Sequence, residues 1–207
     1  MTSISNSLDY SKLYNVSESN ATRPYRLDIR EDSENLSRTE RNELIHGRFL
    51  LSKPLQFDAY RGGQAADFLW STSLVLVGIS SRVIDLLKSN KISGWSTYPV
   101  EIFDRKGGLL PGYYGFAVTG PICTLDRSRS EIVDKPAPVP TGRGYQVYRG
   151  LYFDESQWDG SDMFWVSNGA TIVTEKVYQL FKKHKVTNIL LERLDQHDTY
   201  KGVSNAV

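Results

Sequence analysis

Three histidines are the first side chains to consider for acid–base or metal chemistry, namely His46, His184 and His197. His184 lies among lysines, a composition typical of a solvated helix face and not of a catalytic base. Asp195, His197 and Asp198 have metal-capable side chains, but they crowd into a polar segment that lacks the framework a metal site requires. We therefore expect no catalytic residue and no metal site here.

The common signatures of phosphate binding and nucleophilic catalysis are missing. Gly142-Arg143-Gly144 lacks the third glycine and the helix that would present backbone amides to a phosphate. The sequence contains no Gly-Lys-Ser/Thr motif and no Gly-x-Ser-x-Gly motif. Because Cys123 is the only cysteine, an internal disulfide and a cysteine-based metal site are excluded, which fits a reducing compartment. We expect no cofactor.

One pattern nevertheless points to an enzyme. Tyr60-Arg61-Gly62 followed by Ser71-Thr72-Ser73 resembles the elements that cradle NAD in ADP-ribosyltransferases, although the spacing is short. Such enzymes also need a late glutamate, commonly in a Glu-x-Glu or Gln-x-Glu pair, whereas Glu101 and Glu192 each stand singly in strand-like runs. A turn followed by a buried strand explains the same residues. An enzyme that uses Arg61, Ser71 and a glutamate is therefore kept as an alternative.

The segment Leu151–Asp162 gathers carboxylates around one tryptophan. A tryptophan can anchor a protein interface, and the surrounding acids would complement a basic partner. An ordinary solvated loop with Trp158 folded onto the core is an equally open interpretation. The candidate interface residues are Asp154, Glu155, Trp158, Asp159 and Asp162.

The composition bounds the classes of partner. The chain has 207 residues, of which 40% are hydrophobic, enough for one sizeable core. Its 25 basic residues nearly cancel its 24 acidic ones, which disfavours nucleic acid and anionic membranes as partners. The N-terminal residues form no apolar signal segment, and no stretch approaches the roughly 18 apolar residues of a membrane span. A cytoplasmic location is expected.

Apolar periodicity predicts the elements that must position these residues. Hydroxyl caps at Ser80 and Thr174 precede apolar side chains at helical spacing, which predicts helices over about 81–90 and 174–184. A shorter helix is expected over Arg38–Ile45, ended by Gly47. The proline-rich stretch 134–144 should be a surface loop. Strands are expected at 25–29, 74–77, 98–103, 113–118, 122–125, 145–153, 163–166 and 189–194.

These elements predict one α+β domain over residues 24–195, with a mixed β-sheet and two main amphipathic helices. Residues 1–23 are polar and without pattern, so a flexible arm is expected there, and residues 196–207 should form a weakly ordered polar tail. The two helical regions also repeat one pattern of strand, capped helix, tight turn and strand. At a constant offset Ser80 aligns with Thr174, and Gly94 with Asn188. This predicts an internal pseudo-repeat, although helical periodicity alone is generic.

Several short motifs come in a characteristic order along the chain. They are Gly47-Arg48, Pro54-Leu55, Phe57, Asp67-Phe68, the Ser80–Leu87 helix, Pro99–Ile102, Tyr113–Val118, Leu125–Ser130, Tyr152-Phe153, Phe164–Ser167 and Val186–Ile189. With these motifs the chain resembles, over roughly residues 47–195, immunity protein family eleven of bacterial polymorphic toxin systems, a group first typified by a myxobacterial protein. The proline-rich loop 134–140 and the N-terminal segment do not follow that family's pattern.

The resemblance implies a stoichiometric inhibitor that binds a cognate toxin domain inside the producing cell and needs no cofactor. It does not fix the activity of the toxin. Two other functions stay open, namely the ADP-ribosyltransferase-like enzyme and a regulatory scaffold module unrelated to toxins. The mutual distances of Arg61, Ser71 and a glutamate test the enzyme, whereas only the identity of the partner separates the scaffold.

Overall fold

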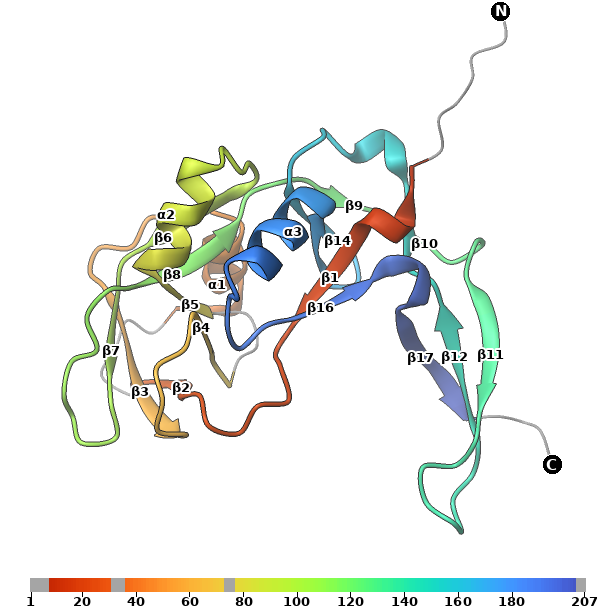
Figure 1. Ribbon diagram of the computed structural model, residues 1–207, viewed down its shortest axis with the longest axis horizontal. Coiled ribbons are helices and arrows are strands. Elements are labelled where there is room, and N and C mark those ends of the chain that lie inside the picture. The colour runs from red at the N-terminus through yellow and green to blue at the C-terminus, as the bar shows by residue number, and fades with distance from the viewer. Residues whose placement is uncertain (1–7, 31–35, 73–76, 204–207) are drawn as a thin grey trace, which may run out of the picture.

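The computed structural model describes residues 8–30, 36–72 and 77–203, which form an α+β domain (Figure 1). Its helices within these ranges are α1 (Arg38–Ile45), α2 (Ser81–Ser89) and α3 (Glu175–Lys183). All three agree with the expected helices to within one residue at either end. The predicted strand at 74–77 lies outside the described residues except for Val77.

One antiparallel sheet has the strand order β4-β5-β8-β6. Helix α2 connects β5 to β6 and begins where the Ser80 hydroxyl accepts a hydrogen bond from the Val83 amide. Its apolar side chains at helical spacing, among them Val83 and Leu87, are fully buried against the sheet. We call this unit A; its strands are β4 (Phe68–Trp70), β5 (Val77–Ser80), β6 (Trp95–Tyr98) and β8 (Tyr113–Val118).

A second sheet repeats this plan, with the order β14-β15-β1-β16 and a short parallel strand, β9 (Ile122–Cys123), added beside β14. Helix α3 connects β15 to β16 and buries Val177, Leu180 and Phe181. We call this unit B; its strands are β14 (Met163–Val166), β15 (Thr171–Thr174), β16 (Leu190–Arg193) and β1 (Leu13–Ser17).

The registers of the two units coincide, which confirms the predicted repeat. Ser80 pairs with Tyr113 in unit A, and its counterpart Thr174 pairs with Leu13 in unit B. The pairing on the other side of β8 and of β1 matches as well, because Tyr98 pairs with Gly115 in unit A and Glu192 pairs with Asn15 in unit B. In each unit a third strand lies between the two strands that the helix connects. This central strand is β8 in unit A and β1 in unit B, and neither belongs to the strand-helix-strand segment.

A third sheet, β2-β3-β7, packs beside unit A. Its buried residues Leu27, Phe57 and Ile102 form one core with Leu44 and Ile45 of α1. A two-stranded pair, β10-β13, lies farther along the chain. These strands are β2 (Arg26–Ile29), β3 (Leu55–Arg61), β7 (Val100–Phe103), β10 (Leu125–Asp126) and β13 (Tyr152–Phe153).

The sheet β11-β12-β17 stands apart from the rest of the molecule in Figure 1. We call it the projecting sheet; its strands are β11 (Glu131–Lys135), β12 (Tyr145–Arg149) and β17 (Asp198–Val203). The proline-rich stretch forms the loop between β11 and β12, as expected, although β11 extends to Lys135. Prolines cannot donate ladder hydrogen bonds, which explains why the strand ends there.

Five expectations are wrong. The arm predicted over residues 1–23 contains β1, whose Leu13 and Tyr14 are buried because β15 and β16 pair with β1 on either side. The tail predicted over 196–207 contains β17, which pairs with β12. The expected strand 98–103 is two strands in different sheets, because Pro99 interrupts the ladder. The expected strands 122–125 and 145–153 are each also two strands in different sheets. Residues 1–7 and 204–207 lie outside the described residues.

Candidate functional site

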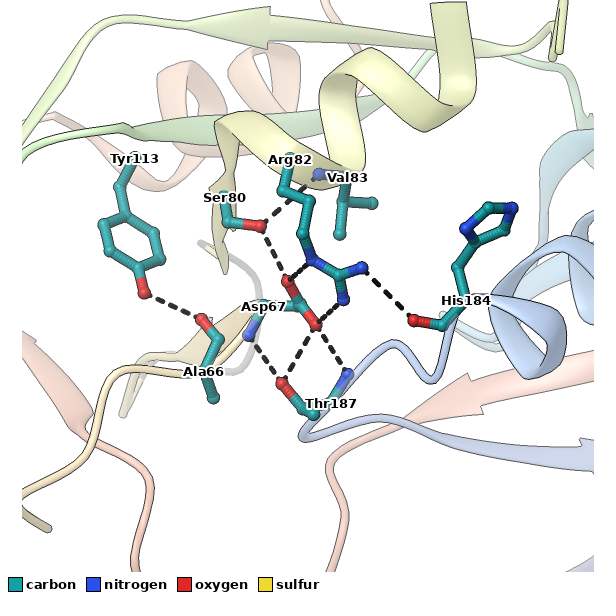
Figure 2. Close-up of polar contacts among 8 residues, drawn as sticks. All are labelled: Ala66, Asp67, Ser80, Arg82, Val83, Tyr113, His184 and Thr187. Atoms are coloured by element: carbon teal, nitrogen blue, oxygen red, sulfur yellow. Dashed lines mark hydrogen bonds and ion pairs between the residues drawn. The ribbon is translucent and has the colours of Figure 1, made fainter. Parts of the chain in front are cut away.

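A dense polar cluster surrounds Asp67, immediately before β4 (Figure 2). Arg82 of α2 donates to both carboxylate oxygens, from Nε at 3.1 Å and from Nη2 at 2.6 Å. Ser80 donates its hydroxyl at 2.9 Å. Thr187, in the turn after α3, donates its amide at 2.9 Å and its hydroxyl at 3.0 Å. The carboxylate thus connects three separate elements.

This cluster joins the two units. Asp67, Ser80 and Arg82 belong to unit A, whereas Thr187 belongs to unit B. Figure 2 also shows the Arg82 guanidinium reaching the backbone oxygen of His184 at the end of α3. Burial alone would raise the pKa of Asp67, but the hydrogen bonds from Arg82, Thr187 and Ser80 outweigh it and lower that pKa.

Asp162, immediately before β14, is the counterpart of Asp67. It accepts hydrogen bonds from the Thr174 hydroxyl and from Lys176, each at 3.0 Å, within unit B. Its remaining partner is Ser93 of unit A, which donates its amide at 3.0 Å. Burial would raise the pKa of Asp162, but the Ser93 amide and Lys176 lower it overall. Each aspartate therefore reaches across to the turn of the other unit, and we call the pair the crossed aspartates.

The hydrogen bonding of the crossed aspartates suits a structural role. Both carboxylates are ionised at neutral pH, because each pKa is lowered, and each accepts several hydrogen bonds from fixed neighbours. Such a carboxylate has little capacity left to move a proton or to bind a ligand. Asp162, a predicted interface residue, is only 9% exposed and is engaged in these contacts within its own chain.

A cavity of about 460 Å³ lies where units A and B meet under α1. Its walls are mainly apolar, with Trp70 and Trp165 at equivalent positions of the β4-β5 and β14-β15 pairs. We call it the junction cavity. Its lining includes Phe68, Trp70, Phe116, Val118 and Trp165 from the two units, together with His46 from the end of α1.

His46 is the one titratable side chain among the described residues that line the junction cavity. It is 8% exposed, and its ring meets Trp165 edge-on at 5.0 Å between centroids. Desolvation lowers the pKa of His46, and nearby Arg48 lowers it further, so the imidazole is neutral at pH 7. Its Nδ1 has no hydrogen-bond partner among the described residues.

The predicted interface at Leu151–Asp162 is only partly on the surface. Trp158 packs against Phe164, with ring centroids 5.5 Å apart, and its indole donates to the Ser161 carbonyl at 3.0 Å. Glu155 forms an ion pair with Arg129 at 2.8 Å. Trp158 is therefore committed to the core of its own chain rather than free as an interface anchor. Asp154 and Asp159 face solvent and accept hydrogen bonds from Ser156 and Ser161.

The residues of the alternative enzyme are not gathered around one cleft. Arg61 is exposed at the end of β3, and Ser71 is 1% exposed beside Leu27 of β2. Glu101 pairs with Gln56 near the start of β3. At about 3.3 Å per residue, Gln56 lies about 16 Å along that strand from Arg61. Glu192 belongs to unit B, where it contacts His197 at 2.7 Å. The geometry gives this alternative no support.

The polar residues near the C-terminal end are engaged separately. Asp195 pairs with Arg193, His197 with Glu192, and Asp198 with Arg149 and Lys135. Across the described part of the chain, no group of three or more potential metal ligands is found. Within those same ranges, no helix has the length and apolar character needed to cross a membrane.

Comparison with known proteins adds no assignment. No protein-family model matches the chain, and no curated protein matches it. The two features that sequence reasoning missed are the junction cavity and the projecting sheet. The alternation of aromatic residues in Tyr145–Arg149 signalled a strand, but nothing in the sequence signalled that this strand pairs with residues near the C-terminal end.

Proposed function

We propose that the chain is an immunity-type binding protein that neutralises a bacterial toxin domain by stoichiometric association in the cytoplasm of the producing cell. The resemblance of residues 47–195 to immunity protein family eleven is one support. The observation that carries the proposal is the projecting sheet, because it offers exposed apolar and aromatic side chains on a part of the molecule that stands apart from the cores (Figure 1).

The exposed side chains lie on both faces of the projecting sheet. Tyr200 is 67% exposed and lies beside Tyr145, with ring centroids 6.1 Å apart. Ile132, in the neighbouring strand β11, is 51% exposed. Isolated exposed apolar residues are common, but several on one small sheet are typical of an interaction surface.

The charges and edges of this sheet also suit a protein partner. Tyr148 lies between two cations, with Arg127 at 4.6 Å and Lys201 at 5.8 Å from its ring centroid. Tyrosine and arginine are enriched in the centres of protein interfaces. In the described residues β11 and β17 each pair only with β12, so each leaves one edge open to a further strand. A folded toxin domain with an acidic patch fits this surface.

The test is co-expression with the toxin encoded by the neighbouring gene, with survival of the host and a one-to-one complex on a sizing column as the readouts. The wild-type chain should protect. Ile132→Asp and Tyr200→Asp together should abolish protection, because the two side chains lie on opposite faces and a charge would be buried whichever face the toxin contacts. Leu50→Asp is the matched control, since Leu50 is 93% exposed and lies outside the sheet.

Two results would count against the proposal in different ways. Failure of the wild-type chain to protect against the neighbouring toxin would refute the immunity function itself. Full protection by the Ile132→Asp, Tyr200→Asp variant would refute the projecting sheet as the contact surface and direct attention to the solvent-facing Asp154 and Asp159, which remain part of the predicted acidic interface.

A further inference from the structure

We propose that the junction cavity binds a small, neutral, ring-containing molecule that carries one hydrogen-bonding substituent. The cavity volume of about 460 Å³ lies within the range of small-molecule sites, which is about 300–1,000 Å³. Its walls come from unit A, unit B and α1, so an occupant would contact all three.

Aromatic rings from both units line part of the apolar cavity wall. The indole N–H groups of both tryptophans are already satisfied, because Trp70 donates to the Asn188 carbonyl at 2.7 Å and Trp165 to the Val118 carbonyl at 2.9 Å. What these two side chains offer an occupant is therefore ring surface and not hydrogen bonds. Ring surfaces from Phe68 and Phe116 add to them, and aromatic rings pack most favourably against another ring.

The charge of the cavity excludes ionic ligands. None of the described lining residues is an aspartate, glutamate, lysine or arginine, and His46 is neutral because its pKa is lowered. A carboxylate or ammonium group that entered would lose its hydration without gaining a counter-charge, which costs several kcal/mol. The occupant should therefore be uncharged.

A few polar groups remain to orient the occupant. Asn42 and Ser167 are exposed on the rim, whereas the unpartnered Nδ1 of His46 is enclosed by protein and is not open to the cavity. The amide and the hydroxyl on the rim therefore favour a ligand with one hydrogen-bonding substituent. An apolar pocket with a few convergent polar groups is the usual design of a small-molecule site.

Calorimetric titration of the full chain tests the proposal with two matched probes. Indole, which is neutral, should bind with one-to-one stoichiometry and raise the melting temperature, since a ligand that binds only the folded state stabilises it. Indole-3-carboxylate, its anionic counterpart, should bind at least tenfold more weakly. Absence of indole binding, or equal binding of both probes, would overturn the proposal.

Filling the cavity supplies the second arm of the test. Thr171→Trp adds bulk from a lining position and should weaken indole binding at least tenfold, whereas Thr97→Trp, at an exposed position of β6 outside the cavity, should not. If Thr171→Trp does not fold, Ile122→Trp fills the rim from a side chain that is 45% exposed. Unweakened binding in a folded filling variant would overturn the assignment. Neither result bears on toxin binding.

Discussion

Units A and B share one backbone plan and differ in how the chain supplies their central strand. In unit A the central strand, β8, follows β6 after a short excursion through β7. In unit B the central strand, β1, comes from the opposite end of the chain, far from β15 and β16 in sequence. The same sheet therefore forms by nearly local pairing in one unit and by pairing between the chain ends in the other.

The two units also satisfy equivalent positions with different residues. Asp67 pairs with an arginine and Asp162 with a lysine. Gly94 and Asn188 both adopt positive φ at equivalent turns, but a Cβ at Gly94 would come within 2.1 Å of the Met163 carbonyl. Asn188 instead uses its side-chain amide to donate to the Phe68 carbonyl at 2.7 Å. The geometry is repeated, whereas the residues that achieve it are not.

Removing the distant central strand should have the largest effect. Deletion of residues 1–17 removes β1 and leaves β15 and β16 without their shared partner, so the chain should fail to fold. Circular dichroism and a sizing column would report the loss. Deletion of residues 1–7, which keeps all described strands, is the control, and a folded 1–17 deletion would contradict the central role of β1.

The crossed aspartates should differ from each other. Asp67→Ala strands Arg82 and the Thr187 amide and should cost about 3 kcal/mol in the free energy of unfolding. Asp162→Ala should cost about 2 kcal/mol, because Lys176 makes one hydrogen bond to Asp162 whereas Arg82 makes two to Asp67.

Urea unfolding measures both variants. Asp85→Ala is the control, since Asp85 is exposed on α2 and should change the free energy by less than about 0.5 kcal/mol. Equal and small losses for Asp67→Ala and Asp162→Ala would show that the two units do not depend on these contacts.

The smallest expected effect is the pH dependence of the same contacts. The folded-state pKa of Asp67 and of Asp162 is lowered, so both carboxylates stabilise the fold above the ordinary aspartate pKa of 3.8. This stabilisation is lost as the pH falls through the lowered folded-state values. The urea midpoint of the wild type should therefore fall more between about pH 7 and pH 3 than that of Asp67→Asn. Parallel curves would contradict this assignment.

Local patterns predicted much of the fold. Ser80 capping, apolar spacing in α2 and α3, and Gly47 at positive φ after α1 were all readable, because each depends on a few neighbouring residues. The repeat was readable for the same reason. The candidate site was much less predictable from the sequence. Trp158 and Asp162 stood out by composition, but whether a side chain faces solvent or a core depends on segments distant in sequence.

The sequence by itself determined the helices, most strands and the pseudo-repeat, since backbone propensity, capping and periodicity act within one element. Only the tertiary structure decided that polar-looking terminal segments become β1 and β17, because a strand between two partners is held by ladder hydrogen bonds whose donors lie far along the chain. It also decided that Asp67 and Asp162 cross between units and that tryptophans of both units enclose one cavity, since those contacts exist only after the two repeats pack together.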